Sequence, residues 1–218
     1  MKKCKPIVVN VCIALMSILM FSQTVSANSK EENAAHVNEE KGVLIIGLNN
    51  NVKSNYFYNG MIAEETGIHA DSISAIYNRI LAVNIAKAAA KKKKIAVNIS
   101  MLGVKSDHLV SEIKVVGEDE DCQSDLSQVI DEEWKKTLDK AQADYVLVLN
   151  QHYLKWQEEQ LRTLFHIVSF SLFDENKKEI YHGNSYFTSA KLITTQEMEK
   201  SSQKSALKIA NNVMKHIE

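Results

Sequence analysis

The chain has 218 residues, of which 45% are hydrophobic and 24% are charged, and its formal net charge is −1. One proline and seven glycines exclude a collagen-like chain and a proline-rich or glycine-rich disordered one. Basic and acidic residues are nearly equal in number, so the sequence predicts no broad basic surface and no nucleic-acid partner. The length suits one globular domain with a tail.

The first 27 residues have the three parts of a secretory signal peptide. Lys2, Lys3 and Lys5 form a basic start, and an apolar run over residues 7–21 follows. Small residues then lead to Ala27, after which cleavage is expected. The run is shorter than the roughly 20 residues of a membrane span, so no stable span is expected after cleavage. These features predict an exported bacterial protein, either periplasmic or secreted.

Three segments are therefore expected: a signal peptide over residues 1–27, a flexible leader over 28–42 and a single α/β domain over 43–218. Removal of the first segment would leave Cys122 as the only cysteine, which excludes an internal disulfide. Its acidic neighbours are expected to raise the pKa of its thiol and make it a poor nucleophile.

The first half of the domain begins with a short apolar run, over residues 43–48, that is typical of a strand buried on both faces. A long connection over residues 49–70 follows, with a short helix expected near 61–66. A helix is predicted over residues 71–93, with Asp71 as its N-cap. Four lysines at 91–94 would complement the negative end of its dipole. A second strand is predicted over residues 95–102.

The second half begins with an ambiguous segment in which a third strand is placed over residues 110–116. Residues 118–125 are predicted to be an acidic loop, and residues 125–141 a helix with Trp134 on its buried stripe. Strands are expected over 145–156, 161–173 and 179–188, with a hairpin turn over 174–178. Thr194 and Glu197 form a capping box that predicts the start of the last helix.

The resulting order is β-α-β-(β)-α-β-β-β-α. It predicts an α/β (α+β) fold in which a mixed β-sheet of about five to six strands is flanked by three helices.

Three stretches resemble a family of bacterial envelope α/β domains. The apolar strand at residues 43–48, the sequence Ala-Asp-Tyr-Val-Leu-Val at 143–148 and the hairpin around Asp174 resemble the corresponding parts of this family. It includes the N-terminal domain of TolB, LpoB and the periplasmic part of CsgG. The resemblance implies this architecture and a non-catalytic adaptor that binds proteins or assembles.

The connection over residues 49–70 is the main candidate for a binding site. It contains Asn50, Tyr56, Phe57 and Tyr58, and it follows the carboxyl end of a buried strand, where ligands gather in open α/β sheets. Exposed tyrosines suit protein interfaces, and long loops are often functional. The alternative is that these aromatic side chains fold back and cover a sheet edge.

His152 and His166 form the second candidate site. A symmetric turn over residues 156–162 would place these two histidines directly opposite each other on neighbouring strands, on the face that also carries Val146 and Val148. Two imidazoles so placed could bind a transition metal, with His182 or Glu158 as a third ligand.

No nucleophile elbow, phosphate loop, dinucleotide fingerprint or His-Glu-x-x-His motif occurs in the sequence. We therefore expect a non-enzymatic protein without a cofactor, which binds another envelope protein or associates with itself. The alternative is a small-molecule or metal-binding protein, including an enzyme, that uses the two sheet histidines.

Overall fold

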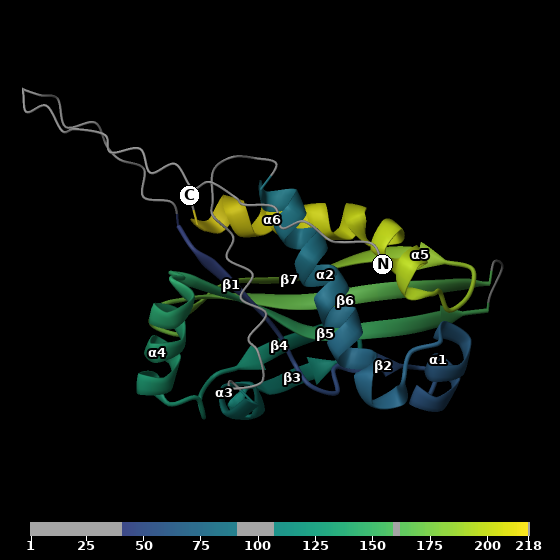
Figure 1. Ribbon diagram of the computed structural model, residues 1–218, viewed down its shortest axis with the longest axis horizontal. Helices are drawn as coiled ribbons and strands as arrows, with labels where there is room; N and C mark the ends of the chain where they lie inside the picture. The colour runs from purple at the N-terminus through teal and green to yellow at the C-terminus, as the bar shows by residue number, and fades with distance from the viewer. Residues whose placement is uncertain (1–40, 91–106, 159–161, 218) are drawn as a thin grey trace, which may run out of the picture. The chain divides into compact units, whose positions relative to one another are not determined.

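The computed structural model describes residues 41–90, 107–158 and 162–217 (Figure 1). These residues form a mixed α+β fold with a five-stranded sheet, a separate two-stranded sheet and six α-helices, which confirms the expected fold class. Helices α2 (Ile73–Ala90), α5 (Thr195–Ser201) and α6 (Gln203–Ile217) cover one face of the large sheet. Helices α3 (Asp107–Glu112) and α4 (Asp131–Ala141) lie on the other side with the small sheet.

The large sheet is built around its longest strand, β5 (Tyr145–Gln157). Strands β1 (Val43–Gly47) and β2 (Val52–Ser54) both run parallel to β5, one after the other along the same edge. On its other edge, β5 pairs with β6 (Thr163–Asp174), which pairs in turn with β7 (Glu179–Ser189), both antiparallel. The strands predicted at 43–48, 145–156, 161–173 and 179–188 are thus confirmed within one to two residues.

Each face of the large sheet buries its own hydrophobic core. The larger core joins α2 and α6 to alternate residues of the strands, such as Leu147, Leu149 and Phe170. The smaller core joins α3 and α4 to the intervening residues, such as Val146 and Val148. A strand buried on both faces has a continuous apolar sequence, and for this reason the sequence pattern predicts β1 and β5 correctly.

A β-bulge at Asn150 changes which residues of β5 share a face. The register of β5 against β6 shifts between Leu149 and Gln151, and Asn150 is fully buried. Its amide group donates to the carbonyl oxygen of Cys122 at 2.8 Å and accepts from the Ser124 hydroxyl at 2.6 Å. Even-numbered residues that follow the bulge face the larger core, whereas even-numbered residues before it face the smaller core.

A buried amide network fixes the turn between β1 and β2. Asn78 of α2 donates to the carbonyl oxygen of Leu48 at 2.9 Å, and its Oδ1 accepts from Asn51 at 3.1 Å. The same Oδ1 lies 2.9 Å from Nε2 of His152 on β5. Gly47 makes this approach possible, because a Cβ there would lie 2.3 Å from Cγ of Asn78. The network therefore positions β2 against β5.

Two expectations for residues 104–125 are wrong. Residues 107–112 form helix α3, so the predicted strand over 110–116 is displaced to β3 (Lys114–Glu118). The predicted acidic loop is a β-hairpin, in which β3 pairs antiparallel with β4 (Asp121–Asp125). Gly117 at φ 101° and Asp119 at φ 50° make the turn possible, since glycine and aspartate tolerate the left-handed region.

Cys122 faces inward from this hairpin and is buried. Burial first, and then the charges of Asp119 and Asp121, raise the pKa of its thiol, as expected from the acidic neighbours.

The helix boundaries differ from prediction mainly at their starts. A 3-10 helix, η1 (Ala70–Ser72), precedes α2, so Asp71 does not act as the N-cap of a single long helix. Helix α4 begins at Asp131 rather than at 125. The capping box of Thr194 and Glu197 is confirmed, although two helices, α5 and α6, follow it. The four lysines at 91–94, the predicted strand over 95–102 and the first 40 residues lie outside the described residues.

Candidate functional site

The connection between β1 and α2 contains more regular structure than its sequence suggested. After a turn at residues 49–50, β2 extends the sheet, and α1 (Asn59–Thr66) follows, which confirms the short helix. Strand β2 pairs in parallel with the second half of β5, from Val52 opposite His152 to Ser54 opposite Leu154. The carboxyl ends of the two strands therefore lie side by side, and the chain leaves β2 there.

Four aromatic side chains gather at these carboxyl ends. The ring of Tyr56 lies 5.0 Å from that of Phe57 and 6.2 Å from that of Trp156, and the rings of Phe57 and Trp156 are 5.9 Å apart. Phe57 and Trp156 pack partly against the larger core. Tyr56 and Tyr58 instead remain 55% and 69% exposed. We call Tyr56, Phe57, Tyr58 and Trp156 the aromatic surface.

Both alternatives drawn from the sequence thus describe part of the aromatic surface. Phe57 folds back onto the core at the sheet edge, as a purely structural role requires. The two flanking tyrosines are among the exposed large hydrophobic residues of the described chain. Large exposed apolar side chains that occur near one another are a feature of contact surfaces, whereas scattered single ones are not.

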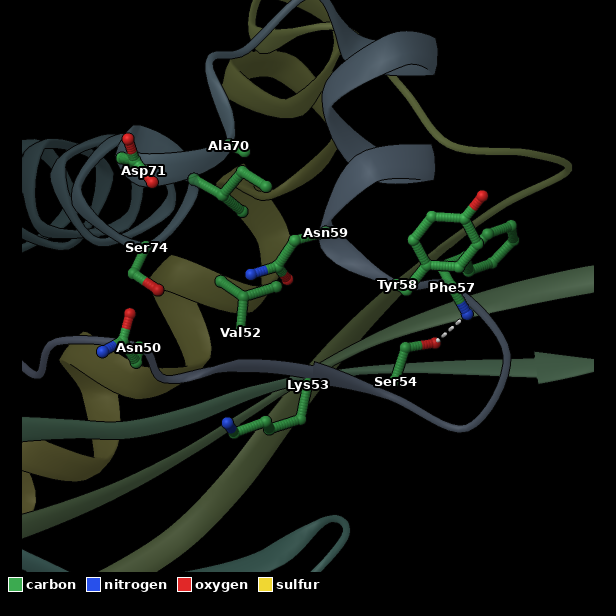
Figure 2. Close-up of a pocket in the computed structure, with 11 residues that line it drawn as sticks. Asn50, Val52, Lys53, Ser54, Phe57, Tyr58, Asn59, Ala70, Asp71 and Ser74 are labelled. Atoms are coloured by element: carbon green, nitrogen blue, oxygen red, sulfur yellow. Dashed lines mark hydrogen bonds between the residues drawn. The ribbon is translucent and has the colours of Figure 1, made fainter.

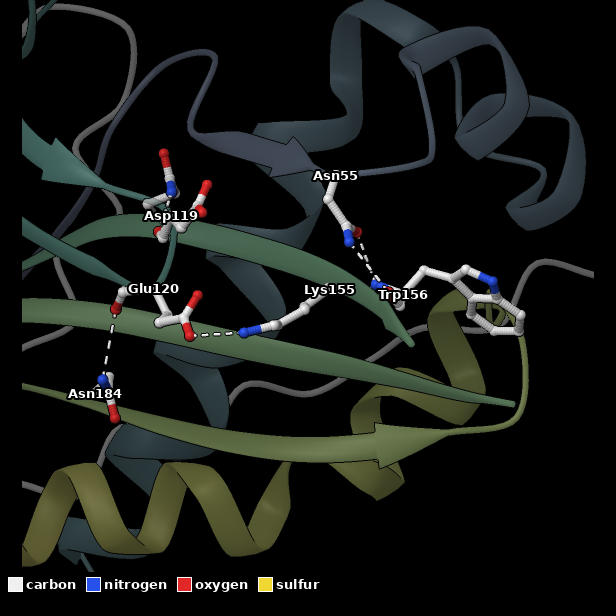
Figure 3. A network of polar contacts seen from close by, with 7 residues as sticks. Asn55, Asp119, Glu120, Lys155, Trp156 and Asn184 are labelled. Atoms are coloured by element: carbon white, nitrogen blue, oxygen red, sulfur yellow. Dashed lines mark hydrogen bonds and ion pairs between the residues drawn. The ribbon is translucent and has the colours of Figure 1, made fainter. Parts of the chain in front are cut away.

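Short polar contacts hold the backbone of this segment in place. The Ser54 hydroxyl donates to the carbonyl oxygen of Leu154 at 2.6 Å and accepts from the backbone N–H groups of Tyr56 and Phe57 at 3.1 and 3.0 Å. The Asn55 side chain then continues the strand pairing (Figure 3): it accepts from the N–H of Trp156 at 2.8 Å and donates to its carbonyl oxygen at 3.0 Å. The aromatic surface is therefore preorganised, which lowers the entropic cost of binding.

Replacement of Ser54 by alanine is expected to loosen the aromatic surface without unfolding the domain. The variant removes one acceptor shared by two backbone N–H groups, so amide exchange at Tyr56 and Phe57 should quicken roughly fivefold, as expected for the loss of about 1 kcal/mol. Hydrogen–deuterium exchange measures this change. Ser127→Ala, on an exposed turn, is the control and should leave both amides unchanged. Equal protection in wild type and Ser54→Ala would show that the hydroxyl does not order the segment.

A groove of about 700 Å³ adjoins the aromatic surface (Figure 2). It lies between β2 on one side and the start of α1, η1 and the first turn of α2 on the other. Asn50, at φ 52°, lines one end of it, and Phe57 and Tyr58 line the other. The remaining lining residues are mostly small or polar: Val52, Lys53, Ser54, Asn59, Ala70, Asp71, Ile73 and Ser74.

A second polar cluster connects the β3–β4 hairpin to the large sheet (Figure 3). Glu120 forms an ion pair with Lys155 of β5 at 2.9 Å, and its carbonyl oxygen accepts from Asn184 of β7 at 3.4 Å. The hydrogen bond from Lys155 is the main cause of the lowered pKa of Glu120. Both partners are more than a third exposed, so this pair contributes little stability and mainly positions the hairpin tip.

The predicted opposition of His152 and His166 is wrong by two residues. His152 pairs with Val168, and His166 pairs with Leu154, because β5 continues to Gln157 before the chain turns. A shift of two keeps both histidines on one face, but the bulge puts that face in the larger core, away from Val146 and Val148.

Both histidines are buried and hydrogen-bonded through Nε2. Nε2 of His152 lies 2.9 Å from Oδ1 of Asn78, and Nε2 of His166 lies 2.9 Å from the Ser189 hydroxyl. The His166 ring also stacks on the Phe187 ring, with 4.5 Å between the ring centroids. Burial lowers the pKa of His152 to about 3, with the charge of His166 as a smaller cause, and it lowers that of His166 to about 4. Metal binding by this pair stays a prediction.

Several residues of the aromatic surface and its support were missed in the sequence. Trp156 belongs to the surface only because β2 pairs with the second half of β5, which no local pattern indicates. Ser54 and Asn55 look like ordinary loop residues in the sequence. The alternation Val-Lys-Ser at 52–54 was the one signal for β2, and three residues are too few to establish a strand period.

A second hollow, of about 750 Å³, lies at the opposite end of β5 and is lined by Lys41, Asp144, Tyr145 and Asp174 among others. It adjoins the amino end of β5, whereas ligands in open α/β sheets bind at the carboxyl ends of strands. The groove beside the aromatic surface has that favoured position.

No protein-family model matches the chain, and no curated protein matches its sequence. Solved structures do match. The hypothetical protein CT253 from Chlamydia trachomatis aligns with a TM-score of 0.47 at 10% identity, over 82% of this chain and 98% of that one. The lipoprotein GNA1162 from Neisseria meningitidis aligns with a TM-score of 0.35 at 11% identity, over 81% and 97%.

The C-terminal domain of LpoB from Salmonella enterica also matches, with a TM-score of 0.24 at 13% identity, over 70% of this chain and 86% of that one. A domain named in the sequence resemblance is thus among the matching structures. At this level of similarity the matches assign neither a family nor a function. None of the helices in the described parts of the chain is long and apolar enough to cross a membrane.

Proposed function

We propose that this chain is an exported, non-enzymatic protein of the bacterial envelope that binds another envelope protein, or a second copy of itself, through the aromatic surface. The observation that carries the proposal is the pair of exposed tyrosines, Tyr56 and Tyr58, on a backbone held by Ser54 and Asn55. Tyrosine and tryptophan are enriched in protein interfaces, and also among the few residues that dominate the binding energy there.

The chemistry of the adjoining groove supports a binding role rather than catalysis. Among the residues that the structure describes, its lining includes one lysine, Lys53, and one carboxylate, Asp71, but no histidine or cysteine. Among the described residues, the groups whose pKa values are strongly altered are Tyr77, His152, Tyr153 and His166, and none of these four lines the groove. The signal peptide expected over residues 1–27 supports export and therefore an envelope partner.

Replacement of both Tyr56 and Tyr58 by alanine is expected to weaken partner binding by about 30-fold or more, because a single aromatic hot spot in an interface contributes about 2 kcal/mol or more. The protein, expressed from its whole coding sequence and purified after export, is analysed by sedimentation velocity for self-association. Chemical cross-linking with mass spectrometry in the envelope fraction identifies a different partner.

Tyr186→Ala is the matched control. Tyr186 is 56% exposed, close to Tyr56, but it lies on β7 and packs on Phe165 at 5.9 Å. The proposal requires that the double variant lose the interaction and that Tyr186→Ala keep it. A strictly monomeric protein without a cross-linked partner would overturn the proposed function, and equal losses in both variants would place the interface elsewhere.

A further inference from the structure

Three metal-ligating side chains meet on the side of the large sheet opposite to α2 and α6. Nδ1 of His108 lies 2.9 Å from a carboxylate oxygen of Glu133 and 3.5 Å from one of Glu112. Within the described residues, this is the one group of three such side chains whose ligand atoms all lie within 4.8 Å of one another. We call His108, Glu112 and Glu133 the histidine–glutamate cluster.

Secondary structure fixes the positions of all three residues. His108 and Glu112 are four residues apart on α3, a spacing that puts them on one helix face. Leu109, which is fully buried, anchors that helix in the smaller core. Glu133 lies in the first turn of α4 and directly precedes Trp134, which is buried in the same core. The cluster therefore joins two helices that are each held by the core.

We propose that the histidine–glutamate cluster binds a divalent transition metal, with Zn²⁺ as the best-fitting cation. Tetrahedral zinc has ligand distances of about 2.1 Å, which place neighbouring ligand atoms roughly 3.4 Å apart. The observed separations of 2.9 and 3.5 Å bracket this value. Imidazole favours zinc over magnesium and calcium, which prefer a full shell of oxygen ligands.

Glu112 and His108 each have one further feature that favours a bound cation. The second carboxylate oxygen of Glu112, Oε2, is buried and has no hydrogen-bond partner, an arrangement that is costly for a carboxylate and that a cation bound to this group offsets. The His108 side chain is 66% exposed. A fourth coordination position facing solvent is consequently open to water, as in zinc sites with three protein ligands.

Isothermal titration calorimetry with ZnCl₂ tests the proposal on the protein expressed from its whole coding sequence, purified after export and treated with a chelator. We expect one zinc per chain and a zinc-dependent rise in melting temperature. His108→Ala, Glu112→Gln and Glu133→Gln should each weaken binding by about tenfold or more, since even residues that only orient metal ligands alter affinity by that factor. Circular dichroism checks that each variant is folded.

His182→Ala is the matched control, because His182 contacts a single carboxylate, Glu179, at 3.4 Å. Its zinc affinity should equal that of the wild type. The proposal is overturned if the protein binds no zinc at zinc concentrations on the order of 100 μM, or if the folded His108→Ala variant binds zinc as tightly as the wild type. In that case the cluster is a polar contact between α3 and α4, in which the hydrogen bond to Glu133 and then the charges of both glutamates raise the pKa of His108.

Discussion

Replacement of Asn78 by alanine is expected to lower the free energy of unfolding by about 4 kcal/mol, because each buried polar group left without a partner costs roughly 1–3 kcal/mol. Asn78 bonds to the Leu48 carbonyl oxygen, to the Asn51 side chain and to Nε2 of His152, and all three would lose this partner together. The alanine would also leave a cavity beside Gly47, whose missing Cβ accommodates the asparagine.

Urea unfolding at pH 7 measures this loss. Arg79→Ala provides the control on the next residue of α2, since Arg79 is exposed and its removal should change stability by less than about 0.5 kcal/mol. A decrease below about 1 kcal/mol for Asn78→Ala would contradict the role given to the network. The same variant should disturb the aromatic surface, because the network holds the turn that leads into β2.

Stability is expected to fall steeply as the pH decreases from 6.5 to 5. His152 and His166 have pKa values of about 3 and about 4 in the folded protein, whereas an unfolded histidine has a pKa near 6.5. Between these values the unfolded chain binds more protons than the folded one, so acid favours unfolding. Each histidine should lower the free energy of unfolding by about 2 kcal/mol over this range, and both together should lower it by about 4 kcal/mol.

Other groups alter this profile little in the same range. Neighbouring carboxylates raise the pKa of His108, so its contribution has the opposite sign: it is present below pH 6.5 and is lost as the pH rises. The pKa values of Glu120, Asp125 and Glu197 are lowered in the folded protein, so each carboxylate contributes stability while it is ionised. That contribution is lost only when the carboxylate is protonated, which happens below this pH range. The two buried histidines therefore dominate between pH 6.5 and 5.

The free energy of unfolding, measured at pH 7 and pH 5, checks this expectation. His166→Leu removes one buried titrating group and should roughly halve the difference between the two pH values. His69→Gln alters a histidine whose side chain is 76% exposed and should leave the difference unchanged. Stability that is equal at both pH values in the wild type would contradict the burial-driven pKa shifts.

Local sequence patterns predicted the long elements of this fold well. The apolar runs of strands β5, β6 and β7 are visible in their own sequences, the turn at residues 174–178 and the capping box at Thr194 depend on residues near in sequence, and all were placed within one to two residues. The bulge at Asn150 could not be predicted in this way. It is stabilised by Cys122, Ser124 and Ser171, which lie more than 20 residues away along the chain.

The candidate site was only partly predictable for the same reason. Tyr56, Phe57 and Tyr58 stood out because aromatic residues are unusual in a long connection, and the structure brings them together. Trp156 joins them through a parallel pairing that depends on the buried Asn78 network. The register of His152 against His166 depended on the length of the turn, which a symmetric guess misplaced by two residues.

Site-specific photo-cross-linking in living cells tests whether this protein binds its partner through the aromatic surface. A photoreactive phenylalanine analogue is introduced at Tyr58 in one strain and at Tyr186 in another, and adducts are identified by mass spectrometry. We expect a discrete adduct with one envelope protein, or with a second copy of the chain, at Tyr58 and none at Tyr186. An adduct at Tyr186 with none at Tyr58 would contradict this expectation.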